Sequence, residues 1–516
     1  MGSLVRPRNP DSPPHAPEKS PMDAIHDLVL AMNDKLTTWG LVPLLAICGV
    51  LFTLWSRGMQ FRSARTMWRV ILGSRSGQEG GISSFQAFCI SLASRVGTGN
   101  IAGVAIALAL GGPGAIFWMW VMALLGMATA FVEATLAQIY KQPHEDNTFR
   151  GGPAFYIQRG LGSRPAGMVF AVCLIFAFGL AFNMVQANTI ADVLSSGHGV
   201  SPTVTAIVLA IVTAAIVLGG VRSVARVTEY MAPIMALVYF LLAVAVIALR
   251  APEVPGALLD IVRGAFGLDQ ALAGTGGAMI AALMNGVKRG MFSNEAGMGS
   301  APNAAATATV SHPAHQGIVQ ATGVFVDTIV VCTATAVMIL LAGPSVYTPG
   351  VTTKEQAGAS LTQAALSSVL GGWVVPVMTV LIFVFAFSSV LGNSTYAEIN
   401  MDFLGGGKVG RLAIRLLVVV AVLVGALAKL AFVWDLADFA MSLMALINLV
   451  AMLFLGRYAI HALRDLERAR NRPEDARYVL DELPQRPRGI VDGVWAEHGS
   501  ATTTGHVDGT KPRPRS

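Results

Sequence analysis

Charged residues are scarce in this chain of 516 amino acids. Asp, Glu, Lys and Arg make up 13% of the residues, about half of their share in a soluble globular protein. Apolar residues make up 54%, and the mean hydropathy is +0.60. A single hydrophobic core stops growing beyond about 250 to 300 residues, so one core cannot hold this much apolar surface. Most of that surface is therefore expected to face lipid.

Features of catalytic, metal-binding and nucleotide-binding sites are also missing. The four cysteines lie inside apolar runs without CxxC spacing, and none of the nine histidines is paired with another in a ligand-like spacing. Residues 405–409 lack the spacing and the hydroxyl group of a Walker loop, and 97–103 is one residue too long for a dinucleotide fingerprint. Only short loops separate the apolar runs. The sequence therefore argues against an enzyme, an ATP-driven pump and a bound cofactor.

Eleven segments are apolar enough for a membrane helix, which needs about 20 residues. A stretch without any charge, 96–132, is too long for one span and is expected to fold back at the glycine-rich turn 111–114. We therefore predict an all-α polytopic membrane protein with eleven transmembrane helices. The spans are expected at 39–56, 82–110, 115–140, 165–190, 202–220, 230–249, 271–310, 317–341, 372–399, 412–428 and 436–455.

Lysine and arginine are distributed unevenly between the two sides of these spans. Thirteen lie in one set of alternate loops and four in the opposite set. Positively charged loops stay in the cytoplasm, so the first set and the C-terminus are predicted to be cytoplasmic and the N-terminus outside, in the plasma (inner) membrane. The richer set comprises the loops 57–81, 141–164, 221–229, 311–316 and 400–411. The same distribution accounts for the net charge of +6 without a nucleic-acid-binding face.

Polar segments flank the membrane region. Residues 1–21 and about 472–516 are rich in Pro, Arg, Ser and Asp, and we predict them to be disordered. A basic tail could contact anionic lipid, although a solvated flap is the expected state. The predicted divisions are an N-terminal polar tail (1–38), an extra N-terminal helix (39–56), two five-helix units (82–249 and 271–456) and a basic cytoplasmic C-terminal tail (457–516).

Two of the eleven segments are interrupted by glycines and polar residues, at 94–103 and at 285–302. Such residues are poor material for a continuous helix, and irregular backbone at membrane depth persists only against protein or a watery cavity. Each break alone could be a close helix crossing without function. Once the first span is set aside, however, the breaks fall in the first and sixth of ten spans. The two five-helix units then cross the membrane in opposite directions, which is the pattern of a secondary transporter and is not needed by a channel.

Paired broken helices also indicate the chemistry of the transported molecule. Half-helix N-termini carry positive dipole ends that suit a carboxylate, while unwound carbonyl groups suit a cation or an ammonium group. A molecule that carries both groups is an amino acid. The sequence therefore predicts an amino-acid transporter.

Five motifs follow one another along the chain: VGTGNIAGVA (96–105), GGPGAIFWMW (111–120), GGPAFYI (151–157), FNMVQAN (182–188) and RGMFSNEAGMGSAP (289–302). Together they resemble the alanine or glycine:cation symporter family. The resemblance spans residues 40–455 and implies a LeuT-type fold, with a five-plus-five inverted repeat after one extra N-terminal helix. It also implies cotransport of sodium with a small neutral amino acid, alanine or glycine.

The two breaks contain most of the expected substrate contacts. Backbone amides of the first break would bind the carboxylate, and carbonyl and hydroxyl groups of the second break would bind the ammonium group. Asn183 and Gln186 are three residues apart and so share one helix face. Their side chains are expected either to form contacts between helices or to line the pocket, and the resemblance favours Gln186 as a pocket residue. The expected substrate residues are Thr98, Gly99, Asn100, Gln186, Ser293, Asn294, Gly297 and Asn393.

A sodium site follows from the resemblance to the LeuT-type symporters. It implies the backbone oxygens of Ala93 and Val96 together with the hydroxyl groups of Ser388 and Ser389. Neutral oxygen ligands suit sodium, a hard cation. The alternative to a sodium site is that the two hydroxyl groups donate hydrogen bonds to backbone carbonyls of their own helix, as serines in membrane helices often do.

The family resemblance leaves two questions about the cargo open. Where the family has a tryptophan after 387–389, this chain has Asn393, which would leave a larger and more polar pocket and makes glutamine an alternative substrate. Proton coupling, with Asp327 or Glu133 as the carrier, is the alternative to sodium. Glu133 and Glu398 are expected in interior ion pairs or gates, and Arg95 with Glu295 is a hypothetical gate pair. No sequence feature indicates the oligomeric state.

Overall fold

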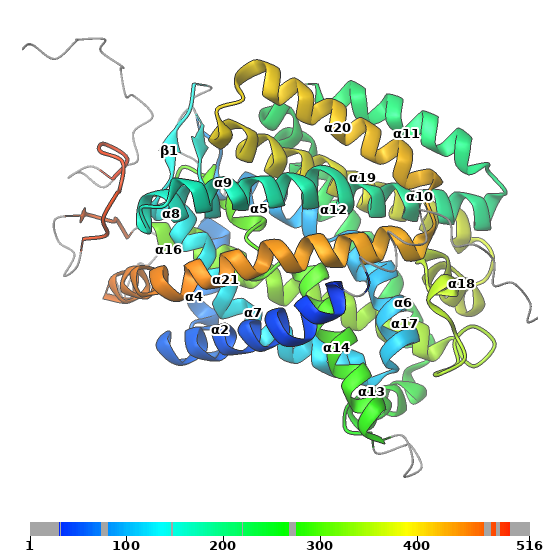
Figure 1. Cartoon of the computed structure of the whole chain (residues 1–516). Helices are drawn as coiled ribbons and strands as arrows, with labels where there is room; N and C mark the ends of the chain where they lie inside the picture. The colour runs from blue at the N-terminus through cyan, green and yellow to red at the C-terminus, as the bar shows by residue number, and fades with distance from the viewer. Residues whose placement is uncertain are drawn as a thin grey trace, which may run out of the picture.

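The computed structural model describes residues 30, 32–73, 81–145, 148–218, 220–267, 275–468, 476–480 and 486–495. Helices dominate this part of the chain, and long ones run side by side, with α21 (orange) extending along most of the bundle (Figure 1). Most of the predicted disordered tails, including 1–21 and 496–516, lies outside the described residues.

The helices through the first half of the chain are η1 (Leu36–Leu41), α2 (Val42–Trp55), α3 (Met59–Arg62), α4 (Ala64–Gly73), α5 (Ser84–Arg95), η2 (Gly99–Gly103), α6 (Val104–Gly111), α7 (Gly114–Ile139), α8 (Pro153–Gly160), α9 (Arg164–Leu174), η3 (Ile175–Ala181), α10 (Phe182–His198), α11 (Pro202–Val217), α12 (Gly220–Leu249), η4 (Ala251–Glu253) and α13 (Val254–Ala265). A two-stranded antiparallel sheet, β1 (Gln142–Pro143) with β2 (Phe149–Arg150), follows α7.

The second half contains α14 (Thr275–Asn294), α15 (Ala301–Ala306), α16 (Pro313–Val324), η5 (Phe325–Cys332), α17 (Thr333–Leu341), η6 (Lys354–Gln356), α18 (Ala359–Leu370), α19 (Val374–Leu404), α20 (Gly407–Leu427) and α21 (Leu430–Arg468).

Eight helices in the described chain are long and apolar enough to cross a membrane, or nine when the bent pair of α5 with η2 and α6 counts as one span. The predicted polytopic membrane protein is confirmed at this level. Each of the eleven expected segments contains helix where the structure describes it. Two are not among the long apolar spans, because α11 has only 16 residues and α14, which includes Lys288 and Arg289, is not apolar enough.

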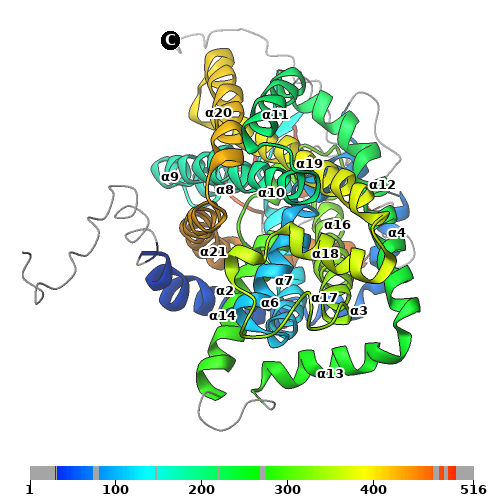
Figure 2. The same cartoon turned by 90° about the vertical axis from the view of Figure 1, so that its right-hand side faces the viewer.

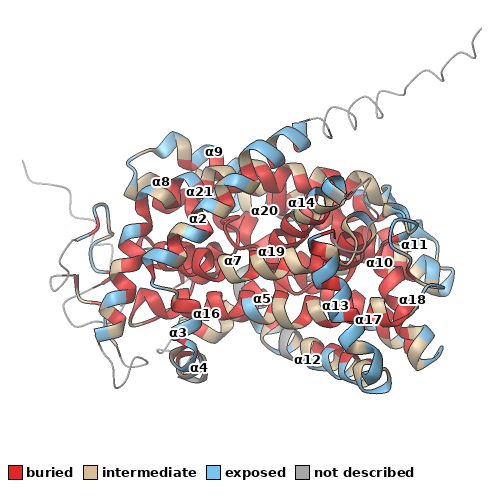
Figure 3. Cartoon of the chain, turned by 90° about the horizontal axis from the view of Figure 1, so that it is seen from below, coloured by how far each residue is buried: buried red, intermediate tan, exposed pale blue. Residues whose placement is uncertain are grey.

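Apolar side chains also cover the outside of the bundle. Figure 3 shows buried residues in the interior and exposed ones on outer helices such as α11 and α13. Large exposed apolar residues include Ile211 (64% exposed) on α11, Leu241 (57%) on α12 and Leu416 (57%) on α20. A soluble protein rarely exposes apolar surface on this scale, so these faces suit contact with lipid.

The first predicted break is confirmed. Helix α5 begins with a capping box between Ser83 and Gln86 and ends at Arg95, and helical structure resumes at Gly99. The two halves are bent by 47°. Gly97 lies so close to α19 that an added Cβ would be 2.2 Å from Ser389 Oγ, so the break also allows a close helix contact.

The second predicted break is confirmed as well. Helix α14 ends at Asn294, and α15 begins only at Ala301. Between them Glu295 has a φ of 56°, and Gly297 and Gly299 each have a φ of 84°. This left-handed backbone cannot continue an α-helix, and it explains why glycine stands at two of the three positions.

Short helices between the spans were not predicted. Helices α8, α13 and α18 lie between expected spans, and Figure 2 shows α13 lying across the lower edge of the bundle. These helices are too short for their apolar pattern to be recognised in the sequence beside runs of about 20 apolar residues.

Part of the C-terminal tail is packed against the bundle, so its predicted disorder is wrong for 476–480 and 486–495. Tyr478 and Trp495 are buried, with ring centroids 5.3 Å apart. The amide of Tyr478 donates to the carbonyl of Ser311 at 3.0 Å. Trp495 also lies over the amino group of Lys141, 5.0 Å from the ring centroid. Figure 1 shows this segment (red) beside β1 and α8.

Candidate substrate and cation site

The two broken helices meet in the middle of the bundle. A Cβ added at Gly99 would lie 3.0 Å from Ser293 Cα and 3.1 Å from a ring carbon of Phe292. The absence of a side chain at Gly99 therefore lets the first break approach the end of α14. The structure thus brings together two predicted site segments that are almost 200 residues apart in the sequence.

A buried carboxylate joins the two breaks. Asn100 Nδ2 donates to Asp327 Oδ1 at 2.6 Å and to Ser293 Oγ at 2.9 Å, and Ser293 Oγ donates to Asp327 Oδ2 at 2.7 Å. Asp327 is fully buried in η5, a π-helical turn inside the eighth expected span. Turns of this kind are frequent at functional sites. From the sequence, Asp327 was predicted only as an alternative proton carrier, although an aspartate inside an apolar run is itself a signal of a functional site.

Asn100 also fixes the shape of the first break. Its Oδ1 accepts a hydrogen bond from the amide of Gly97 at 2.9 Å, and its Nδ2 reaches the carboxylate of Asp327. One amide side chain thus satisfies a backbone donor freed by the break and connects it to η5. Thr328 Oγ1 supplies Asp327 with a further donor at 2.8 Å.

Three of the four predicted sodium ligands lie together. Ser388 Oγ and Ser389 Oγ donate to the carbonyl of Ala93 at 3.3 and 3.0 Å. Val96, the fourth, is buried where α5 ends at the break. Each hydroxyl has one hydrogen, and the carbonyl of Phe385 on the same helix also lies within hydrogen-bond distance, at 2.8 Å from Ser388 Oγ and 3.1 Å from Ser389 Oγ. The geometry therefore allows the alternative backbone contact as well.

Several buried polar atoms near the breaks lack a partner. Thr98 Oγ1, Gln186 Oε1 and Trp434 Nε1 have no hydrogen-bond partner among the described residues. An unpaired buried polar group costs about 1 to 3 kcal/mol, which a bound polar molecule can recover. This supports Thr98 and Gln186 as pocket residues and adds Trp434, which the sequence did not single out.

An aromatic layer and an ion pair adjoin the α14 side of the second break. The ring of Phe292 lies between those of Phe182 and Trp434, at centroid distances of 4.5 and 4.6 Å. Arg289 forms an ion pair with Asp438, and its guanidinium group lies 4.8 Å from the ring centroid of Trp434. The layer can separate the site from one side of the membrane.

Glu133 binds backbone and forms no ion pair in the described chain, so of the two predicted roles, ion pair or gate, the ion pair is wrong. Its two carboxylate oxygens accept hydrogen bonds from the amides of Gly297 and Gly299, each at 3.2 Å. Asn448 Nδ2 donates to the same carboxylate at 3.0 Å. Glu133 therefore satisfies backbone donors that the second break leaves without helical partners. The predicted ion pair of Glu398 is present, with Arg415 at 2.8 Å.

Asn294 and Gly297 both have partners within the protein. Asn294 Oδ1 accepts from the amide of Ala296 at 3.0 Å, and the carbonyl of Gly297 accepts from Asn448 Nδ2 at 3.0 Å. Asn393 Oδ1 lies 2.8 Å from Ser94 Oγ, and Asn393 Nδ2 donates to Asn183 Oδ1 at 3.1 Å. Asn393 therefore lies beside the first break.

The hypothetical gate pair is not formed in this conformation. Arg95 donates to the side chain and the carbonyl of Gln320, at 2.6 and 3.2 Å. Glu295 instead accepts from Ser94 Oγ and Ser300 Oγ, at 2.7 and 2.6 Å. The described contacts include no ion pair between Arg95 and Glu295.

Comparison with known proteins places this arrangement in a family. A probable sodium/glutamine symporter GlnT from Bacillus subtilis is 45% identical, over 89% of this chain and 94% of that protein. An amino-acid carrier protein AlsT from the same organism is 46% identical over 84% and 91%, and a sodium/alanine symporter AgcS from Methanococcus maripaludis is 42% identical over 81% and 92%.

Among solved structures, a manganese transporter from Eremococcus coleocola shares the fold, with a TM-score of 0.51 and 14% identity over 72% of this chain and 78% of that one. The model of the sodium:alanine symporter family matches residues 22–479. The resemblance seen in the sequence motifs is confirmed: the chain belongs to the sodium:alanine symporter family, whose members are transporters and not enzymes.

Proposed function

We propose that this protein couples the entry of sodium to the uptake of a small neutral amino acid, alanine or glycine, by alternating access. The observation that carries the proposal is the meeting of the two breaks at Gly99 and Ser293, beside the buried carboxylate of Asp327. The names of the relatives support sodium and either alanine or glutamine as cargo. Glutamine is the second candidate because Asn393, which lies beside the first break, is smaller than the expected tryptophan.

In this proposal the ends of the amino acid bind to different breaks. The second half of the first broken helix begins at Gly99, with Thr98 as its N-cap, so its amide groups and dipole suit the carboxylate. Ser293 and Asp327 suit the ammonium group, since a buried carboxylate is the strongest partner for it. Gln186, Asn294, Gly297 and Asn393 complete the proposed surroundings.

Uptake of radiolabelled L-alanine into proteoliposomes tests this function. We expect an inward sodium gradient to drive accumulation and an inward proton gradient to drive none. Excess unlabelled glycine should compete. Accumulation driven by protons alone would overturn the sodium proposal, and competition by glutamine but not by glycine would favour the larger substrate.

We propose that sodium binds to the carbonyl oxygens of Ala93 and Val96 and to the hydroxyl groups of Ser388 and Ser389. The close contact of both serines with Ala93, where the first break begins, supports this set. Sodium bound there would link α19 to the broken helix. Ion binding would in this way stabilise one arrangement of the bundle.

Ser389→Ala is expected to raise the sodium concentration for half-maximal uptake at least about tenfold. The loss of one ligand that contributes about 1.4 kcal/mol to the binding free energy weakens the affinity by that factor. The measurement is alanine uptake as a function of external sodium. Ser394→Ala on the same helix is the matched control, since Ser394 Oγ donates to the carbonyl of Leu391, one turn back, at 2.7 Å. Equal sodium dependence in the two variants would contradict the site.

We also propose eleven membrane crossings, with repeats at 82–249 and 271–456, the N-terminus outside and the C-terminus in the cytoplasm. The two breaks lie in corresponding helices of these units, which supports an inverted repeat. With this orientation, the Arg289–Asp438 pair and the Trp434 layer lie on the outer side of the site and form an outer gate.

The gate proposal predicts charge dependence at Arg289 and Asp438. Each single alanine variant leaves a buried charge without its partner, which destabilises by about 3 to 5 kcal/mol and should nearly abolish uptake. The exchange variant, with Arg289→Asp and Asp438→Arg together, should recover folded protein and part of the uptake. Failure of the exchange to improve on both single variants would contradict the gate.

A further inference from the structure

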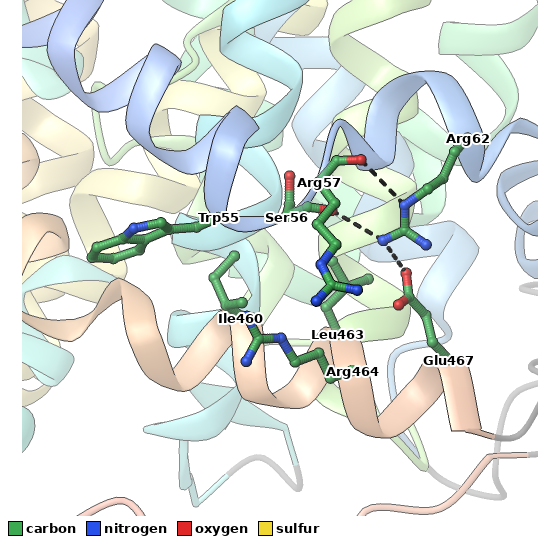
Figure 4. Close-up of a pocket in the computed structure, with 8 residues that line it drawn as sticks. All are labelled: Trp55, Ser56, Arg57, Arg62, Ile460, Leu463, Arg464 and Glu467. Atoms are coloured by element: carbon green, nitrogen blue, oxygen red, sulfur yellow. Dashed lines mark hydrogen bonds and ion pairs between the residues drawn. The ribbon is translucent and has the colours of Figure 1, made fainter.

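A second pocket lies far from the two breaks, between the end of α2 and the last turns of α21. Its volume is about 150 Å³. Figure 4 shows it with its lining residues, among which three are arginines. They are Trp55, Ser56, Arg57, Arg62, Ile460, Leu463, Arg464 and Glu467.

One of the arginines builds the wall of the pocket. Arg62 Nη2 donates to the carbonyl of Ser56 at 3.0 Å and forms an ion pair with Glu467 at 2.7 Å, while its Nε donates to the carbonyl of Arg57 at 3.2 Å. Arg62 thereby ties the turn after α2 to α21. Its charge is balanced by Glu467.

The other two arginines have no such balance. Arg57 and Arg464 have no ion pair or hydrogen bond from their guanidinium groups among the described residues, and Figure 4 shows both directed into the pocket. Two positive charges held at one small pocket repel each other unless an anion lies between them. Arginine binds phosphate groups with two parallel hydrogen bonds, so phosphate is the anion that fits best.

The backbone at Arg57 adds a second observation. Its φ is 56°, in the left-handed region that glycine occupies most easily, and Gly58 follows with a φ of 63°. A glycine at position 57 would relieve the strain, yet the chain has arginine. A strained residue that keeps its side chain is consistent with a binding role for that side chain.

The surroundings identify the source of the phosphate. Leu54 is 69% exposed and Trp55 38% exposed beside the pocket, and Phe61 and Trp68, on α3 and α4, are each 64% exposed. Exposed aromatic residues at the end of a membrane helix are typical of the membrane–water interface. The arginines therefore lie at the level of lipid head groups, with apolar surface for acyl chains next to them.

We propose that this pocket binds the phosphate group of an anionic glycerophospholipid. With the proposed orientation this is a lipid of the cytoplasmic leaflet, and only the choice of leaflet rests on the proposed function. The lipid would bridge α2, the helix outside the two repeats, to α21, the last helix of the second repeat. Arg57 and Arg464 bind the phosphate, and Arg62 holds them in place.

The test is native mass spectrometry of the full-length protein, purified in detergent and titrated with phosphatidylglycerol, phosphatidylcholine or inorganic phosphate. The site variant combines Arg57→Gly with Arg464→Gln. The control variant combines Arg164→Gln with Lys408→Gln, which removes two exposed charges from loops of the same predicted side. We expect the wild type and the control to retain phosphatidylglycerol in preference to phosphatidylcholine, and the site variant to bind it at least about tenfold more weakly.

Equal binding of the two lipids to the wild type, or equal phosphatidylglycerol affinity of the site and control variants, would overturn the proposal. Binding of inorganic phosphate with no preference for phosphatidylglycerol would overturn the lipid source. Arg464→Gln alone, which leaves the strained turn untouched, gives the same test if the double variant does not fold. Lipid retention is measured without transport, so failure of the symport proposal would not change this result.

Discussion

Asp327→Asn is expected to reduce sodium-driven alanine uptake at least about 100-fold. The carboxylate accepts hydrogen bonds from Asn100, Ser293 and Thr328, whereas an amide has one acceptor oxygen and adds its own donors. Hydrogen bonds to a charged group contribute about 1.5 to 3 kcal/mol each, so the loss of two corresponds to two or more powers of ten. The measurement is initial uptake per folded transporter in proteoliposomes.

The same variant separates the two possible roles of Asp327. If the carboxylate binds the ammonium group, exchange of external for internal alanine will be lost together with gradient-driven uptake. If it carries a proton, exchange will persist while accumulation is lost. Glu398→Gln is the control, since Glu398 is also a buried carboxylate of a span, but its partner Arg415 is 21% exposed and keeps access to water when the ion pair is lost. Uptake by Asp327→Asn above a third of the wild-type rate would contradict both roles.

Gly299→Ala is expected to be the most destabilising single-methyl substitution in the non-helical segment between α14 and α15. Gly299 has a φ of 84°, and its added Cβ would lie 2.7 Å from Pro153 Cγ and 2.9 Å from Asn448 Cγ. The left-handed backbone costs about 1 to 2 kcal/mol and the overpacking about 1 to 3 more. Asn448 also binds Glu133, so the displacement would disturb the contacts that hold the break.

Gly405→Ala isolates the backbone part of this effect. Gly405 has the same φ of 84° but no atom within 4 Å of an added Cβ. We expect a small fall in the thermal unfolding midpoint for Gly405→Ala and a several-fold larger one for Gly299→Ala, measured on purified protein in detergent. Similar falls would show that crowding at Gly299 is relieved by movement of its neighbours.

The breaks could be located from the sequence because they interrupt apolar runs with residues that helices disfavour. Glycine at 97 and 99, and charge at 295 inside a span, are visible without any partner. The same local reasoning could not show what holds the breaks in shape. The carboxylate of Glu133 accepts hydrogen bonds from the backbone amides of Gly297 and Gly299. A hydrogen bond between residues so far apart in the sequence cannot be recognised from the residues around either partner.

Asp327 is a second residue whose partners could not be predicted from the local sequence. Its residue type marked it as functional, but its place in the site depends on partners more than 30 and more than 220 residues away in Ser293 and Asn100. Likewise, the aromatic layer of Phe182, Phe292 and Trp434 forms between separate helices. Each of these side chains alone reads as an ordinary apolar residue of a span.

The packed C-terminal segment has a consequence for how this protein should be handled. The polar composition of the chain after Arg468 suggests that it can be truncated there. Truncation would remove Trp495, which lies over the amino group of Lys141, and Tyr478, which packs against the ring of His312. Burial lowers the pKa of Lys141, and its amino group donates to the carbonyl of Ala308 at 2.8 Å. Truncation would expose this amino group to water and favour its protonated form, beside the loop that follows the second broken helix. Purification tags and fluorescent fusions therefore belong after residue 495, behind a flexible linker.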